Sequence, residues 1–293
     1  MSDAVVLMAY GSPERLADVP AYYADIRGGR PIRPELLADL VERYRRLGIE
    51  DGSPLNAITE AARAALEQEL GFPVYTGMRH WTPRIAEAAE RALAGGAERV
   101  VGLVLAPHYS GMSIGRYRAL LEEALDGRAE LLFVERWGEE PGFVGLLADR
   151  VRGTEAHVVF TAHSLPARIV EEGDPYRDEL LETSRLVAEE AGVEGWSFSF
   201  QSESPTGEPW LGPDILDHLA DLRGRGVGSV LLCPVGFVAD HLEIKWDLDT
   251  EARERADELG LELARIELPN ADAAFVEVLA GLVRRALALP SRV

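Results

Sequence analysis

Residues 158–166 read VVFTAHSLP, a short apolar run that ends at a histidine and a Ser-Leu-Pro turn. Its β-branched and aromatic residues predict a buried strand, and the turn residues predict where that strand ends. A similar string, VVLMAYGSP, occupies residues 5–13. We interpret the two strings as equivalent strands of two related lobes. Tyr10 and His163 would then lie at equivalent strand ends and could face each other across a cleft.

On either side of these strings, short β-rich runs alternate with longer helical patterns along the whole chain. This alternation predicts an α/β fold built of βα units, with mainly parallel sheets flanked by helices. The strands are expected near residues 4–9, 73–77, 98–105, 130–135, 156–162, 196–201, 228–234 and 262–267. The helices are expected over 56–70, 83–94, 113–126, 141–152, 175–192, 213–223, 240–259 and 271–289.

The polar string RWGEEP at 136–141 contains Gly and Pro and is the expected crossing between lobes. We therefore predict an N-terminal lobe over residues 1–138 and a C-terminal lobe over residues 139–269. The remaining residues, 270–293, are expected to form a helix that packs back on the N-terminal lobe.

Charge and cysteine content exclude several classes of function. Asp and Glu number 50 against 30 basic residues, a net charge of −20 that disfavours nucleic acid and anionic membrane surfaces as partners. Cys233 stands alone, so the chain can form neither an internal disulfide nor a four-cysteine iron–sulfur cluster. No apolar run is long enough for a membrane helix, and the N-terminus lacks the features of a signal peptide. We expect a cytoplasmic protein that is not integrated in a membrane.

Three carboxylates recur at four-residue spacing in the segment after the strand expected at 228–234. Glu243, Asp247 and Glu251 fall on one face of a helix, and a local π-turn would align them further. Like charges at this spacing repel, so something should offset the repulsion. A hydrated divalent cation that passes along the row is one candidate.

The alternative is an ordinary solvated acidic face with ion pairs four residues apart. The pairs expected in that case are Asp249–Arg253 and Glu251–Arg255. His241 lies two residues before Glu243, so on a helix it would point away from that carboxylate, and we interpret it either as structural or as a residue that supports the site without contacting the metal. Residues 27–46 carry six arginines against three acidic residues. This basic segment is either an amphipathic helix with a solvated face or a clamp for an anionic ligand.

Several strings together resemble the ferrochelatase family, from MAYGSP at 8–13 onward. The most specific are TAHSLP at 161–166, the string from QSES to PWLGPD at 201–214, and PVGFVADHLE at 234–243. The resemblance implies two Rossmann-like, chelatase-type lobes that enclose a porphyrin cleft. It also implies insertion of Fe²⁺ into a free-base tetrapyrrole.

The resemblance also implies roles for individual residues. His163 matches the family's metal-binding histidine and Glu243 its carboxylate partner, so both are implied to be catalytic. Asp247 and Glu251 match an acidic row that relays metal or protons. Tyr10 resembles the tyrosine that faces the iron from the other side in the coproporphyrin branch. The residues that fall where that branch holds the propionates are Arg27, Arg43, Tyr44, Ser53 and Tyr117.

The basic segment, Tyr10 and the absence of an apolar membrane lip favour coproporphyrin III as the substrate and coproheme as the product. Fe²⁺ is then a substrate, and no permanently bound cofactor or iron–sulfur cluster is expected. The product would be handed to a downstream enzyme of heme biosynthesis. Alternatives are a protoporphyrin IX ferrochelatase, a cobalt or nickel chelatase, and a non-catalytic heme or porphyrin carrier.

Overall fold

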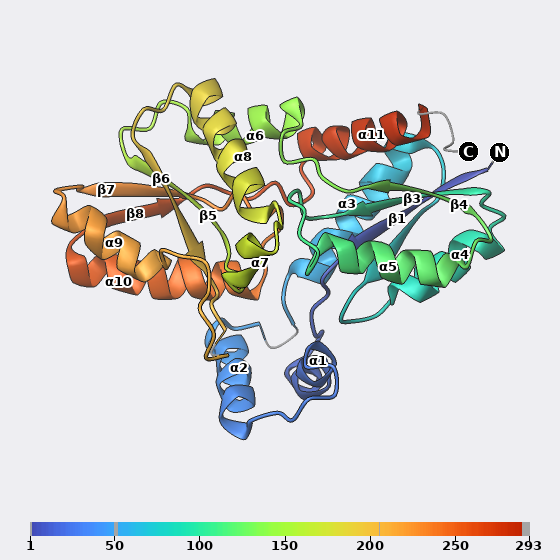
Figure 1. The fold of residues 1–293 in the computed structure, drawn as a ribbon, viewed down its shortest axis with the longest axis horizontal. Coiled ribbons are helices and arrows are strands. Elements are labelled where there is room, and N and C mark those ends of the chain that lie inside the picture. The colour runs from blue at the N-terminus through green and yellow to red at the C-terminus, as the bar shows by residue number, and fades with distance from the viewer. Residues whose placement is uncertain (1, 50–51, 205, 289–293) are drawn as a thin grey trace.

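The computed structural model describes residues 2–49, 52–204 and 206–288, which form two parallel four-stranded sheets (Figure 1). All eight predicted strands are confirmed, each with boundaries within two residues of those expected. The first sheet has the order β2-β1-β3-β4, and its strands are β1 (Asp3–Ala9), β2 (Val74–Met78), β3 (Arg99–Val104) and β4 (Glu130–Val134). The second has the order β6-β5-β7-β8, and its strands are β5 (His157–His163), β6 (Trp196–Gln201), β7 (Ser229–Cys233) and β8 (Glu262–Arg265).

The two sheets share one topology, which supports the equivalence of the two similar strings. In each sheet the chain moves from its first strand to one neighbour and later crosses to the other side. Such a reversal of direction leaves a crevice at the carboxyl ends of the strands, where open α/β sheets bind ligands. Tyr10 directly follows β1, and His163 is the last residue of β5. Both residues therefore lie at the switch point of their sheet.

Helices cover both faces of each sheet, as the alternating pattern predicted. One layer is common to both sheets, and its buried side chains belong to a single core that includes residues of β1 and β5. Within that layer α11 packs against α3 and α6, and α6 packs against α8. The members of this shared layer are α3 (Leu55–Leu70), α6 (Pro141–Val151), α8 (Tyr176–Ala191) and α11 (Ala273–Ala288).

Two further cores lie on the opposite faces. The first sheet is covered there by α4 (Ile85–Ala94) and α5 (Ile114–Leu125). The second sheet is covered by α9 (Ile215–Gly224), the π-helix η2 (Ile244–Ala252) and α10 (Arg253–Leu259). None of the helices in the described residues combines the length and apolar character needed to cross a membrane.

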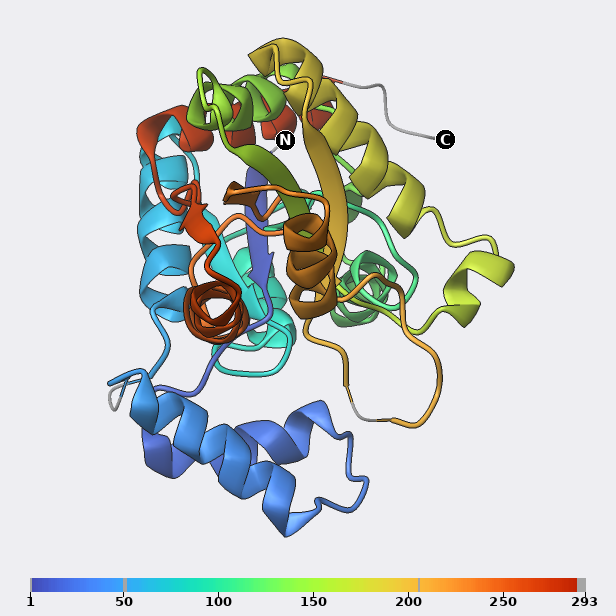
Figure 2. The same ribbon diagram turned by 90° about the vertical axis from the view of Figure 1, so that its left-hand side faces the viewer.

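The structure also contains short elements that were not predicted. They are the 3₁₀ helix η1 (Leu16–Asp18) and the helices α1 (Val19–Ile26) and α7 (Arg168–Glu171). The helix α2 (Pro34–Arg46) corresponds to the amphipathic helix that was one of two alternatives for the basic segment. Helices α1 and α2 project from one side of the molecule, below both sheets (Figures 1 and 2). The basic segment is therefore a loop over 27–33 followed by α2, which begins at Pro34, where the missing N–H costs nothing.

Gly236 follows β7 and allows two backbones to approach closely. A Cβ at this position would lie 2.6 Å from the Cβ of Ala162 in β5. Gly145 in α6, by contrast, has open space where a Cβ would go.

We expect Gly236→Ala to destabilise the protein by about 1–3 kcal/mol, because the loop must move away from β5. The matched change Gly145→Ala should stabilise it by about 0.5–1 kcal/mol, since alanine favours the helix. Urea denaturation of both variants measures the two effects. Equal stability of the two variants would contradict the close approach.

Candidate active site

His163 lies where β5 ends beside β6. The parallel register pairs His163 with Gln201, and the Nδ1 atom of His163 lies 3.5 Å from the Gln201 carbonyl oxygen. The backbone N–H of Ser164 donates to the same oxygen at 2.7 Å. Further along, the N–H of Leu211 donates to the carbonyl of Leu165 at 2.9 Å. The strings TAHSLP and QSES to PWLGPD, separate in sequence, therefore form one surface around the histidine.

Glu243 reaches the same place from β7, through the turn that contains Gly236. It is the residue before the π-helix, and its side chain is partly exposed. Burial alone would raise the pKa of Glu243, but the charges of His163 and His241, together with a hydrogen bond from Ser202, lower it to about 2. The structure thus brings His163 and Glu243 together, and Glu243 is an anion at neutral pH.

The interpretation of His241 as pointing away from Glu243 is wrong. Its Nε2 atom lies 3.7 Å from the Glu243 carboxylate, and its Nδ1–H donates to the Ala239 carbonyl at 2.9 Å. The reason is that the expected helix over 240–259 begins only after His241, so helical spacing does not apply to this pair. Burial lowers the pKa of His241, but the Glu243 carboxylate raises it by more.

Asp247 is buried, four residues after Glu243. Burial and the charge of Glu243 raise its pKa to about 7, although the Ser202 hydroxyl donates a hydrogen bond to its Oδ2 atom. Arg43 of α2 lies 3.8 Å from its Oδ1 atom. A cavity of about 140 Å³ is lined by Asp247, Glu251, Arg43 and Ser202. Asp247 can therefore exchange a proton near neutral pH beside a small polar space.

Asp247 and Glu251 of the carboxylate row lie in the π-helix that Glu243 directly precedes, and its i→i+5 bonding widens the turn. Side chains four residues apart then lie on the same side of the helix, and the predicted alignment of the row by a π-turn is confirmed. The ion pairs predicted for a solvated acidic face are wrong. Asp249 binds Arg265 at 2.7 Å instead of Arg253, and Arg255 binds Glu258 instead of Glu251.

Tyr10 approaches the site from the first lobe. Its side chain is 40% exposed, and its ring lies 4.6 Å from that of His80, whose Nδ1 atom is 2.8 Å from an Asp25 oxygen. Surrounding protein raises the pKa of Tyr10, and the nearby charge of Glu243 raises it further. Tyr10 and Glu243 thus interact across the two lobes.

Tyr117 is buried on α5, with the Arg79 guanidinium 5.5 Å from its ring.

The other predicted porphyrin contacts have local partners. Tyr44 is buried, and its hydroxyl lies 3.1 Å from the hydroxyl of Ser12. Burial raises its pKa to about 12. The Ser53 hydroxyl accepts the N–H of Leu55 at the start of α3. Arg27 donates to the Pro31 carbonyl at 3.4 Å, and its buried Nε–H has no hydrogen-bond partner in the described residues.

Ser202 is a further residue of the site, and its role was not predicted from the sequence. It links Glu243 and Asp247, and it adopts a left-handed backbone with φ of 65°. That conformation is uncommon for serine and is typical of functional sites. The QSES string pointed to the loop, but nothing in it identified this serine.

Comparison with known proteins shows the family to which this chain belongs. The Ferrochelatase family model matches residues 2–287. This chain belongs to the ferrochelatase family. It is 44% identical to a ferrochelatase of Herpetosiphon aurantiacus, over 96% of this chain and 97% of the relative. It is 42% identical to a coproporphyrin III ferrochelatase of Halalkalibacterium halodurans, over 97% of both chains. The comparisons support ferrochelatase function in heme biosynthesis.

Solved structures of other proteins superpose on this chain over nearly its whole length and share its fold. SirB from Bacillus subtilis with Fe³⁺ superposes with a TM-score of 0.63 at 12% identity, covering 98% of this chain and 96% of SirB. CbiX, described as the terminal enzyme of siroheme biosynthesis in denitrifying bacteria, superposes with a TM-score of 0.54 at 15% identity, covering 99% and 100%. The predicted chelatase-type fold of two lobes, each with a parallel sheet flanked by helices, is thereby confirmed.

The raised pKa of Asp247 has a consequence for stability. Between the ordinary carboxyl pKa of 3.8 and about 7, the folded chain holds a proton that the unfolded chain has released. Stability therefore falls as pH rises through this window. We expect Asp247→Asn, which needs no proton, to gain on the order of 2–4 kcal/mol relative to the parent between about pH 5 and pH 8.

Chemical denaturation of metal-free protein across this pH range measures the gain. Asp257→Asn on α10, an exposed carboxylate, is the matched control and should show a flat difference. A flat difference for Asp247→Asn as well would contradict the assignment of the proton.

Proposed function

We propose that this chain inserts Fe²⁺ into coproporphyrin III, giving coproheme and two protons, as a cytoplasmic step of heme biosynthesis. The observation that carries the proposal is the arrangement of Glu243 and Asp247. Glu243 is held as an anion by the charges of two histidines. Asp247, the next carboxylate of the row, titrates near neutral pH. A site that must attract a cation and remove protons needs both properties.

Metallation replaces two pyrrole N–H protons by the metal, so the site needs proton acceptors close to the ring. His163 can accept a proton when its imidazole is neutral, and the Glu243 carboxylate attracts the metal ion and stabilises the imidazolium that forms. Asp247 and Glu251 then continue the path toward the small cavity beside Arg43. In this proposal the row conducts protons outward or iron inward. Tyr10 faces the metal from the opposite lobe.

Arginines near α1 and α2 provide the binding energy for an anionic substrate. Coproporphyrin III carries four carboxylates, and the loop over 27–33, whose sequence contains Arg27, Arg30 and Arg33, lies below the two lobes (Figure 1). The Arg27 guanidinium carries a positive charge that can pair with a propionate. Binding of these remote groups can offset the cost of bending the macrocycle toward the metal. Arg43, Tyr44, Ser53 and Tyr117 complete the proposed porphyrin site.

The choice of porphyrin rests on the basic loop, on Tyr10 and on the relatives named coproporphyrin III ferrochelatase. The alternative is protoporphyrin IX, because the relatives from Herpetosiphon and Deinococcus are named only ferrochelatase. We further propose that the enzyme holds no resident cofactor and no iron–sulfur cluster, since Cys233 is single and buried. Coproheme would pass to a downstream enzyme of the pathway.

Anaerobic absorbance spectroscopy with Fe²⁺ tests the proposal. The free-base bands of coproporphyrin III should disappear faster than those of protoporphyrin IX. His163→Ala and Glu243→Ala should each slow metallation by at least about a hundredfold, because the first removes a proton acceptor and the second removes the anion that attracts the metal ion.

Glu258→Gln, which removes an exposed carboxylate on α10, is the control and should leave the rate unchanged. A preference for protoporphyrin IX would reject the substrate proposal. Full activity of Glu243→Ala would reject the mechanism, and tight porphyrin binding without metallation would indicate a carrier.

A second experiment tests the role of Arg27. We expect Arg27→Met to raise the KM for coproporphyrin III about tenfold, the effect of losing one charge-assisted hydrogen bond, and to leave kcat nearly unchanged. Steady-state kinetics at fixed Fe²⁺ measure both constants. Arg152→Met on the far helical layer serves as the control. A fall in kcat with an unchanged KM would show that Arg27 does not hold the substrate.

A further inference from the structure

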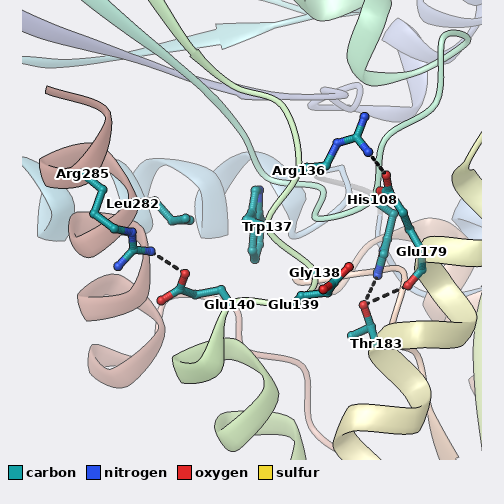
Figure 3. A pocket seen from close by; sticks show the side chains of 10 residues that line it. All are labelled: His108, Arg136, Trp137, Gly138, Glu139, Glu140, Glu179, Thr183, Leu282 and Arg285. Carbon is teal, nitrogen blue, oxygen red and sulfur yellow. Dashed lines mark hydrogen bonds and ion pairs between the residues drawn. The ribbon is translucent and has the colours of Figure 1, made fainter. Parts of the chain in front are cut away.

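A second cavity in the described residues lies away from the proposed iron site. It has a volume of about 380 Å³, within the range of small-molecule sites. Its walls come from the loop after β3, the β4–α6 connection, α8 and α11 (Figure 3). The cavity therefore lies where elements of both lobes meet.

His108 supplies an unpartnered acceptor in this cavity. It is only 3% exposed, and burial lowers its pKa to about 3, so the imidazole is neutral. Its Nε2 atom lies 2.9 Å from the Thr183 hydroxyl, which itself donates to the Glu179 carbonyl at 3.0 Å. The hydroxyl has one proton, so Nε2–H must donate to it. The Nδ1 atom is then a bare lone pair, and it has no hydrogen-bond partner in the described residues.

Carboxylates add negative charge beside this acceptor. The Glu179 side chain is 13% exposed, accepts the N–H of Tyr109 at 2.7 Å, and pairs with Arg136 at 2.8 Å. Burial and the nearby charge of Glu139 raise the pKa of Glu179. Overall the cavity is lined by three glutamates and two arginines. One negative charge is left over, which favours a ligand that carries one positive charge.

The side chains that line the cavity favour an organic cation over a metal ion. No three metal-binding side chains are grouped for a metal ion anywhere in the residues described. Figure 3 shows His108, Glu179 and Thr183 at one end and Glu140 with Arg285 at the other. The indole of Trp137 lies between the two ends, and Leu282 also lines the space. A ligand with an apolar body and one charged end matches these walls.

We propose that this cavity binds a small organic monocation, a primary ammonium group on an apolar body. The ammonium would donate to His108 Nδ1 and to the Glu179 carboxylate, and the body would contact Trp137 and Leu282. Because these residues come from both lobes, binding would hold the lobes in one arrangement and stabilise the folded chain. The proposal is independent of the proposed iron chemistry.

Calorimetric titration of the full chain with phenethylamine tests the proposal, with 2-phenylethanol as the neutral probe of the same shape. We expect saturable binding of the amine, at least about tenfold tighter than that of the alcohol, because charge-assisted hydrogen bonds are the strong ones. The amine should also raise the melting temperature of the parent protein. Glu179→Gln should weaken amine binding at least about tenfold.

Glu179 also accepts a backbone hydrogen bond, and a second variant distinguishes loss of ligand binding from a change in the fold. Glu139→Gln, which changes an exposed side chain at the same cavity, is the second variant and should weaken binding too. Glu277→Gln on the exposed face of α11 should not. Absence of saturable binding, or equal affinity for the alcohol, would overturn the proposal. So would binding of Zn²⁺ alone that is lost in Glu179→Gln, because the site would then hold a metal.

Discussion

The distance between the two lobes is fixed by the helical layer that they share. Tyr10 and Glu243 belong to different lobes, so the contacts that each makes within its own lobe do not set the distance between them. The apolar side chains of α3, α6, α8 and α11 form one continuous core under both sheets. Because protein interiors are close-packed, that core resists sliding of one sheet against the other. The site at the strand ends depends on this rigidity.

Electrostatics then divide the roles within the carboxylate row. Glu243 and Asp247 are only four residues apart, yet their pKa values are shifted in opposite directions. Histidines neutralise the first, whereas the second is buried and faces the charge of the first. Two like groups whose environments separate their pKa values are typical of sites that move protons. Ser202 contacts both carboxylates, and its strained backbone holds its hydroxyl between them.

Periodic patterns predicted most of the fold, because strands and long helices bury regular sets of apolar residues. The apolar run placed His163 at the end of a buried strand, whereas the roles of His163 and Glu243 were implied by motifs that resemble those of a known family. Residues 16–26 were not predicted as helical, because a short segment with few buried side chains has a weak period. His241 was misplaced for a related reason: the helix begins two residues later than its pattern suggested. Ser202 could not be identified, since its role comes from contacts made by residues far apart in sequence.

The position of α11 has a consequence for how the chain is made. This last helix covers α3 and the neighbouring strands of the first sheet, although the whole second sheet separates them in sequence. While the ribosome is still producing the second lobe, the part of the first lobe's apolar face that α11 later covers remains exposed. The first half of the chain therefore cannot complete its core on its own. Both lobes reach their final packing only after the C-terminal helix has been released.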